Sequence, residues 1–410
     1  MPIIERISCR DFPLEDEGVK VKDVLKLIEK TGFEEELFKV FDLESIKNEF
    51  IEVPGASTLV HAILNIENRL KKIDITAQLK DVKTVGFTDE NQALLEIANI
   101  ENEELLKLFR KDLIDFETTY SVKADYFNQL YDMNKYLSFL LNKEYRDIVN
   151  NNIDMLEEKN KENEDEKVFK TVIDNKKNRY VRAIVSKRYK DYNIPFSVFV
   201  TLIQLHSLNK NKNLSFSVSK FSLTDSEIRV EFKNEKEYDF FDKSKVSFSL
   251  VLTNDEIKRD AVKLKGLFSI NFDDVNAYLN PNEGNTNIMS FKHGVKVDNV
   301  KQKLSSLGFD ILEFVNGTLD DLKFVKRVNT STTILEIQDR LIQKVDNARD
   351  KNFLPLKEEV KKRLLLKKVD NLFDLLSLVD KVDEVFSDEY IQAQDYWRYK
   401  VYQTLVKRGK

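Results

Sequence analysis

In the middle of the chain, the apolar side chains change from helical spacing to strict alternation with polar ones. The clearest case is Ile228, Val230 and Phe232, each of which is followed by a charged residue. Because successive side chains of a strand point to opposite faces, this spacing predicts strands with one apolar face and one wet face. Short polar breaks separate the strands, which favours an antiparallel sheet. The segments that show the pattern are 214–218, 228–233, 246–252 and 264–272.

Both ends of the chain space their apolar residues for helices instead. After the sheet we expect a helix at 298–307, a strand at 309–315 and further helices from Pro355 onward. The segregation of helices from strands predicts an α+β fold, in which mostly helical N- and C-terminal parts flank a central antiparallel-sheet domain. The helices expected in the first part span 21–28, 34–50, 57–70, 89–114 and 121–148, the last with an apolar stripe of Phe127, Leu130, Leu137, Leu141, Tyr145 and Ile148.

The chain of 410 residues exceeds one ordinary hydrophobic core, so we expect it to divide into domains. The run 157–167 contains no apolar side chain and is interpreted as a linker. The expected division is a helical domain at 1–156, a charged linker at 157–170, an α+β domain with an antiparallel sheet at 171–355 and a C-terminal helical segment at 356–410.

The C-terminal segment carries apolar residues at intervals of seven, namely Leu365, Leu372, Val379 and Phe386. This spacing suits a helix of a bundle and a short coiled coil equally well. A cap at Asp370 or Asn371 would instead begin a new helix and split the run.

Glycine and cysteine are scarce, and this narrows the chemistry that the chain can support. The sequence holds 10 glycines and 1 cysteine, and it shows no Gly-rich phosphate loop or other catalytic signature. The 3 histidines lie far apart and form no cluster with Cys9, so we expect no metal and no other cofactor. His61 and His206 are interpreted as core residues. The absence of a signal-peptide layout and of a long apolar run predicts a cytoplasmic protein that is not membrane-embedded.

The strongest concentration of positive charge lies between residues 176 and 190, in a segment without acidic residues. Cations bind phosphates, and the tyrosines in and beside this segment could stack on unpaired bases. The net charge of the chain is -5, so any nucleic-acid surface must be local. The alternative is a solvated face balanced by the preceding acidic run. The candidate nucleic-acid contacts are Lys176, Lys177, Arg179, Arg182, Lys187, Arg188 and Lys190.

The final helix, expected from Asp388 to Lys410, is aromatic on two faces. Tryptophan and tyrosine are enriched at the centres of protein interfaces, so this helix is a candidate binding site for a protein partner. The alternative is a terminal helix docked on its own domain. The candidate partner-binding residues are Tyr390, Tyr396, Trp397, Tyr399 and Tyr402.

Two further candidates involve a loop and a helix start. The loop 281–294 holds His293 beside Ser290 and Lys292, a set that could bind an anion. Ser57 or Thr58 is expected to cap a helix, whose free N–H groups could alternatively hold a phosphate.

A nuclease-like spacing occurs in one strand. Glu231 and Lys233 have the Glu-x-Lys spacing of metal-dependent nuclease strands, and Asp225 lies upstream. Any strand rich in glutamate and lysine produces the same pattern, so the simpler interpretation is the wet face of an alternating strand.

Without a catalytic signature, the sequence favours a non-enzymatic accessory or adaptor subunit of an intracellular multiprotein assembly. The alternative is a nucleic-acid-binding protein that uses the 176–190 segment, and the second alternative is a divalent-metal-dependent nuclease. Residue types with AT-rich codons dominate, which favours a low-GC bacterium or its mobile elements and a phage–host conflict setting, either defence or counter-defence. The expected partner is a protein, with nucleic acid and self-association retained as alternatives.

Overall fold

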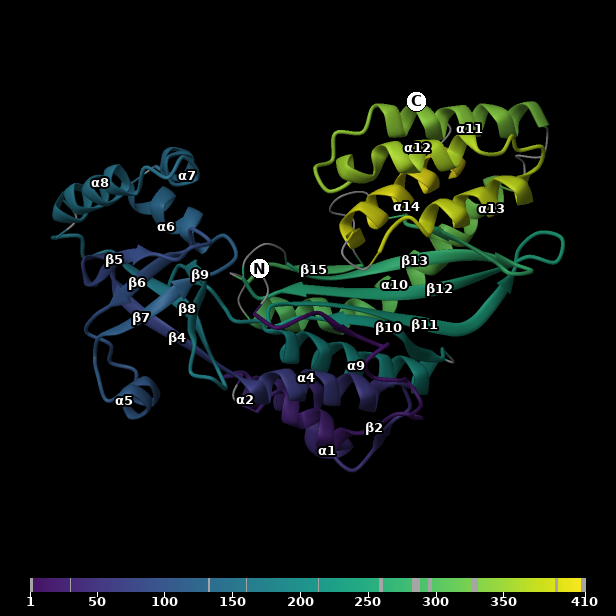
Figure 1. Ribbon diagram of the computed structural model, residues 1–410. Helices are drawn as coiled ribbons and strands as arrows, with labels where there is room; N and C mark the ends of the chain where they lie inside the picture. The colour runs from purple at the N-terminus through teal and green to yellow at the C-terminus, as the bar shows by residue number, and fades with distance from the viewer. Residues whose placement is uncertain are drawn as a thin grey trace.

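The computed structural model describes residues 3–29, 31–131, 133–159, 161–212, 214–257, 261–281, 288–293, 297–325, 331–387 and 390–406. Helices lie toward both ends of the chain and a large antiparallel sheet lies between them, so the α+β class expected from the sequence is confirmed. Figure 1 shows two bodies side by side: a large sheet between two layers of helices, and a smaller sheet that carries its own helices.

The larger body is built on a seven-stranded antiparallel sheet, called sheet A. Phe232 lies opposite Leu250, and Leu252 lies opposite Leu264, so the alternating apolar side chains share one face. The antiparallel sheet predicted for the middle of the chain is therefore confirmed. In spatial order its strands are β1 (Ile7–Ser8), β10 (Phe216–Leu223), β11 (Glu227–Asp239), β12 (Lys245–Asp255), β13 (Val262–Phe272) and β14 (Val275–Leu279), and β15 (Met289–Phe291) pairs with β13.

Three helices cover the apolar face of sheet A, namely α4 (Ala56–Arg69), α9 (Ile194–Lys212) and α10 (Val297–Val325) (Figure 1). The strand expected at 309–315 is wrong, because α10 continues through these residues. Its buried side chains keep helical spacing over a longer stretch than the local alternation, and the longer pattern prevails. These side chains are Leu304, Leu307, Ile311 and Val315.

The opposite, polar face of sheet A was expected to be wet, but C-terminal helices cover part of it (Figure 1). Asn371 accepts a hydrogen bond from the N–H of Asp374 at 2.9 Å and so begins a separate helix. The residues spaced by seven therefore belong to a bundle of short helices and not to one continuous coiled coil. The helices are α11 (Ser331–Asp346), α12 (Lys357–Leu365), α13 (Leu372–Asp383) and α14 (Ile391–Val406).

The smaller body is built on a six-stranded sheet, called sheet C, with its own apolar core. Its spatial order is β4 (Leu70–Gln78), β8 (Glu166–Asp174), β9 (Arg179–Val185), β7 (Ile114–Thr118), β6 (Ala93–Ile97) and β5 (Val82–Phe87). The helix expected at 89–114 is wrong, since β6, a short helix and the start of β7 occupy this range. Ala93, Leu95 and Ile97 are buried at every second residue, which is strand spacing. The helices of this body are α5 (Glu103–Phe109), α6 (Val122–Tyr131), α7 (Asn134–Asn142) and α8 (Arg146–Lys159).

The acidic run 157–167 connects α8 to β8. Strands β4 and β8 pair from Leu70 with Asp174 to Gln78 with Glu166, so sheet C combines residues from both sides of the expected linker. The expected domain limits stay a prediction.

The N-terminal segment packs under the larger body. It contains β2 (Val19–Lys20), α1 (Val21–Val24), α2 (Glu34–Phe41), α3 (Leu43–Ile46) and β3 (Phe50–Ile51). The cap expected from Ser57 or Thr58 is instead the carboxylate of Asp16, which accepts hydrogen bonds from both backbone N–H groups at 3.1 and 2.9 Å. The start of α4 therefore already holds an anionic group. None of the helices in the part of the chain that the structure describes is long and apolar enough to span a bilayer.

Candidate functional site

A buried cluster of charges joins the two bodies. Glu256, directly after β12 of sheet A, accepts hydrogen bonds from Arg182 of β9 at 2.7 Å and from Lys72 of β4 at 2.9 Å. The side chains of Glu256 and Arg182 are 0% and 1% exposed. Burial alone would raise the pKa of Glu256, but Lys72 and Arg182 more than offset it and hold that pKa well below its usual range. The ionised carboxylate therefore links sheet A to two strands of sheet C.

Asp225, between β10 and β11, extends this cluster. Its carboxylate accepts hydrogen bonds from the hydroxyl of Tyr120 at 2.7 Å and from the N–H of Ile3 at 2.9 Å. The backbone oxygen of Asp225 accepts a third from Arg182 at 3.1 Å. Removing one partner from such a buried set typically costs about 3–5 kcal/mol, because a charge is left without compensation. The cluster therefore acts as a clamp between the two bodies.

His293, expected in an exposed loop, is buried beside the clamp. Its ring stacks on Tyr189 with the ring centres 4.9 Å apart. Burial lowers the pKa of His293, so the imidazole is neutral at neutral pH and offers no positive charge to an anion. Ser290 of the candidate loop lies in β15, opposite Lys263 of β13, and Lys292 is exposed. Residues 282–287 and Gly294 of the loop lie outside the described residues.

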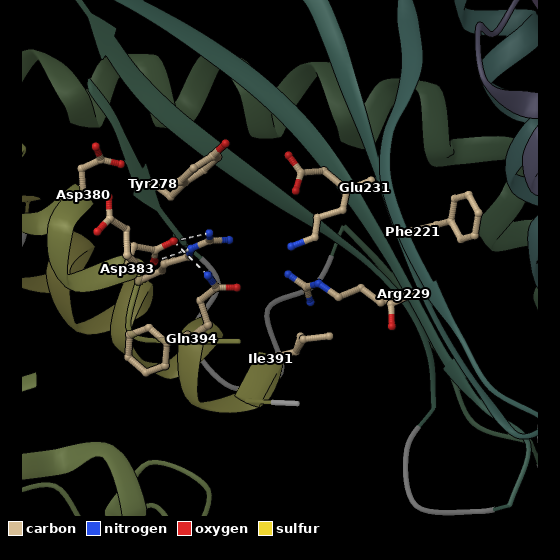
Figure 2. A pocket seen from close by; sticks show the side chains of 13 residues that line it. Phe221, Arg229, Glu231, Tyr278, Asp380, Asp383, Ile391 and Gln394 are labelled. Carbon is tan, nitrogen blue, oxygen red and sulfur yellow. Dashed lines mark hydrogen bonds and ion pairs between the residues drawn. The ribbon is translucent and has the colours of Figure 1, made fainter. Parts of the chain in front are cut away.

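A cleft separates the polar face of sheet A from α13 and α14, as Figure 2 shows. One cavity of about 310 Å³ is lined by Glu231 and Tyr278 of the sheet and by Asp380 and Arg398 of the helices. A second cavity, of about 710 Å³, shares Arg229 with the first. Positive and negative side chains both line the cleft, so the ion pairs among them decide which charges are left to bind another molecule.

The protein itself neutralises much of this charge. Both oxygens of the Asp395 carboxylate accept hydrogen bonds from Arg229, at 3.1 and 3.0 Å, and Lys265 lies 3.2 Å from one of them. Burial opposes ionisation of Asp395, yet Arg229 and Lys265 hold its pKa well below the usual range. Arg398 donates to Asp383 at 2.9 Å. The contacts of Asp395 attach α14 to the sheet, and the pair of Arg398 with Asp383 joins α14 to α13. Much of the charge in the cleft is therefore used to hold the helices in place.

The nuclease-like residues are not brought together. Glu231 faces the cleft, whereas Asp225 belongs to the clamp and lies in the turn before β11; the strand from Glu227 to Glu231 alone spans about 13 Å. Within the described ranges, no group of three or more His, Cys, Asp or Glu side chains is placed to hold a metal ion. The described residues therefore offer no assembled site for that chemistry.

The fold divides the basic segment 176–190. Lys176 and Lys177 lie in the turn before β9, and Lys187 and Arg188 follow its far end, with roughly 23 Å of strand between the two pairs. Arg182, midway along β9, is buried in the clamp.

The other basic residues of the segment are partly engaged. The guanidinium of Arg179 lies over the ring of Phe109 at 5.4 Å, and Lys187 forms an ion pair with Glu166. The side chain of Lys190 is exposed, and its backbone N–H donates to the backbone oxygen of His293 at 2.5 Å. The nucleic-acid hypothesis stays a prediction, now resting on two separated groups of cations instead of one continuous stripe.

The aromatic C-terminal helix packs within its own chain. Trp397 is fully buried, and the hydroxyl of Tyr402 donates to Asp321 of α10 at 2.5 Å. Tyr396 packs on Phe353, with ring centres 5.1 Å apart. Intramolecular docking, the alternative named for this helix, accounts for these three side chains. Tyr390 and Tyr399 are half-buried, and a role in binding a partner stays a prediction for them.

The outer side of α7 and α8 carries the largest group of exposed apolar side chains among the described residues. Five of them, called the α7–α8 face, are between 46% and 66% exposed: Tyr136, Phe139, Tyr145, Ile148 and Met155. In Figure 1 these helices form the outer layer over sheet C, away from the larger body. The inner sides of the same helices are buried in the core of sheet C. The exposed side chains are therefore additional to those that hold the helices in place.

Sequence reasoning missed this face because it predicted one helix through residues 121–148. Glu144 instead adopts a left-handed conformation with φ 63° and ends α7, so α8 begins with a new rotation. Val149 and Ile153 now point inward, whereas Tyr145 and Ile148, expected on the buried stripe, point outward. The sequence did contain a signal for this face, the pair Ile148 and Met155. These residues are seven apart and therefore share one side of a helix, but a different side from Val149 and Ile153.

No protein-family model matches the chain, and neither the curated proteins nor the solved structures give a significant match.

Proposed function

We propose that the chain is a non-enzymatic subunit of a multiprotein assembly and that it binds a protein through the α7–α8 face. The observation that carries this proposal is the exposure of five large apolar side chains on two adjacent helices and the turn between them. Scattered exposed apolar residues need no explanation, but a contiguous group of this kind is typical of a protein-binding surface.

The composition of the face supports the same proposal. Two tyrosines, a phenylalanine and a methionine are among its five members, and these residue types are enriched at protein interfaces. Another exposed apolar group, at Leu354, Leu365 and Leu366, is smaller and lacks aromatic residues. The charged clefts and the clamp, by contrast, are largely satisfied by the chain's own side chains.

The test is to purify the chain from the cells that make it, as wild type and as the double variant Phe139→Glu with Met155→Glu. We expect one protein species at fixed stoichiometry to remain with the wild type and to be absent from the variant, because two charges on the face prevent apolar contact. The measurement is native mass spectrometry of the purified material.

The matched control is Phe309→Glu, which places the same charge at an aromatic residue of α10 that is 70% exposed. This control should retain the partner. Equal retention by all three proteins contradicts the proposal, and so does a wild type that neither retains another protein nor associates with a second copy of itself. Retention of nucleic acid alone favours the alternative based on the 176–190 segment.

A further inference from the structure

We infer that the occupant of the α7–α8 face is the same face of a second copy of this chain, with the two copies related by a two-fold axis. This inference rests on the proposed function, since it names the partner of that face. It is carried by the distribution of charge around the apolar side chains.

The two helices of the face have opposite charge. The segment 134–143, which forms α7 and its last turn, contains Lys135 and Lys143 and no acidic residue, for a net charge of +2. Helix α8 contains four acidic and two basic residues, for a net charge of 2 − 4 = −2. The apolar side chains of the face are thus carried by one helix of positive net charge and one of negative net charge.

The difference in charge between α7 and α8 remains when the charged side chains that form contacts within the chain are set aside. Arg146 of α8 turns inward, where it donates to the backbone oxygen of Thr88 at 3.2 Å. Glu157 also turns inward and accepts from the N–H of Thr84 at 2.7 Å. Glu158 forms an ion pair with Lys161, so its charge is balanced within the chain. The exposed charges that remain are Lys135 and Lys143 on α7, Glu144 in the turn between the helices, and Asp147, Asp154 and Lys159 on α8. Helix α7 therefore stays basic, and the exposed charges of α8 sum to 1 − 2 = −1.

These charges run parallel to the apolar residues. On α8, Asp147 and Ile148 recur two turns later as Asp154 and Met155, so an acidic edge follows the apolar stripe. On the basic helix, Lys135, Phe139 and Lys143 lie four residues apart and share one side. On α7 the two lysines therefore lie one turn to either side of Phe139, and on α8 the two aspartates border the apolar residues Ile148 and Met155.

A two-fold axis makes such a surface complementary to itself. In an isologous contact each pair of touching residues occurs twice, so the lysines of α7 in each copy meet the aspartates of α8 in the other. A different protein would need to reproduce this pattern of apolar and charged residues, whereas a second copy carries it by construction. Apolar contact supplies the attraction, and the charges fix the orientation.

The size of the face sets the expected strength. Helices of 9 and 14 residues, each about 10 Å wide, present roughly 350 Å² per copy. The total of roughly 700 Å² lies below the usual range for stable specific interfaces, so the dimer should be weak and reversible, with a dissociation constant in the micromolar range or above.

Charge reversal provides the test, using the full chain in sedimentation equilibrium from about 10 µM to about 1 mM. One variant, Lys135→Glu with Lys143→Glu, makes both borders acidic. The other, Asp147→Lys with Asp154→Lys, makes both borders basic. We expect the wild type to show a monomer–dimer equilibrium. Each variant alone should dimerise at least about tenfold more weakly, because like charges then face each other.

An equimolar mixture of the two variants should recover dimers, since an acidic face then meets a basic one. The control Lys362→Glu with Lys368→Glu makes the same change of charge at exposed positions in and after α12 and should dimerise like the wild type. A variant that fails to fold would not recover in the mixture, so circular dichroism of each variant accompanies the measurement.

The inference is overturned if the wild type stays monomeric at the highest concentration, if the single variants dimerise like the wild type, or if the mixture does not recover. A monomeric chain that still retains another protein through Phe139 and Met155 overturns only the inference and leaves the proposed function standing. A monomeric chain that retains no protein overturns both.

Discussion

The C-terminal layer of helices over sheet A and the layer over sheet C differ in how far they cover their aromatic side chains. The C-terminal layer, α11 to α14 over sheet A, buries Trp397 and nearly all of Tyr402 against its own chain. In the layer over sheet C, α6 buries Phe127, whereas α7 and the turn after it leave Tyr136, Phe139 and Tyr145 about half exposed. The comparison shows that aromatic content alone does not identify a binding helix, because the same residue types serve internal packing in one layer and remain uncovered in the other.

The two layers are also attached differently. Helix α14 is held to the polar face of sheet A by the contact of Asp395 with Arg229 and Lys265. The layer over sheet C is held by apolar side chains such as Phe127 and Leu137, which belong to one core with the strands. In α14, charged side chains point toward the sheet and form this contact. In α7 and α8, apolar side chains form the inner contact, and a second apolar stripe faces solvent.

The largest expected difference between the layers is in stability. Replacing Trp397→Ala should lower the free energy of unfolding by about 3–5 kcal/mol, because a fully buried aromatic side chain leaves a cavity. Replacing Phe139→Ala should change it by less than about 0.5 kcal/mol in the monomer, since the side chain is more than half exposed. Urea unfolding of dilute protein measures both, and equal losses would contradict the contrast between the layers.

A smaller effect concerns acid. The folded-state pKa of Asp395 lies below the ordinary value, because Arg229 and Lys265 outweigh the effect of burial. Its contribution to the free energy of unfolding is therefore complete above about pH 4 and is lost as the pH falls through the folded-state pKa. The variant Asp395→Asn should be less stable than the wild type near pH 7, by about 2–3 kcal/mol, and this gap should narrow below about pH 4.

The matched control for the acid effect is Asp154→Asn, which alters an exposed carboxylate of α8. Its difference from the wild type should stay below about 0.5 kcal/mol at each pH. If the gap for Asp395→Asn is the same at every pH, the attachment of α14 does not depend on the ionised carboxylate.

Much of sheet A could be predicted from the sequence, because its alternation is set by residues that are close together along the chain. Ile228, Val230 and Phe232 all lie in the core as the spacing indicates. The cover over its polar face could not be predicted, since Arg229 and Asp395 are far apart in sequence and nothing local relates them. Arg182 was likewise assigned to a basic surface, because its partner Glu256 is 74 residues away.

Sheet C was missed although its local signal was present. Ile73, Ile75 and Ala77 are buried at every second residue, as strands require. The intervening α5 and the helices after β7 gave the segment a mixed pattern that favoured helix throughout. The α7–α8 face was hidden by one further local feature, the left-handed Glu144, whose conformation breaks an otherwise continuous apolar stripe.

The central claim is that the α7–α8 face, and not the aromatic C-terminal helix, contacts a partner protein. Hydrogen exchange of the full chain, as a dilute monomer and in the complex that it forms with a second copy or with a co-purifying protein, tests this claim most directly. We predict added protection within residues 134–159 and unchanged protection within residues 391–406, because only the first segment has an uncovered apolar side. Added protection confined to residues 391–406 would contradict the claim.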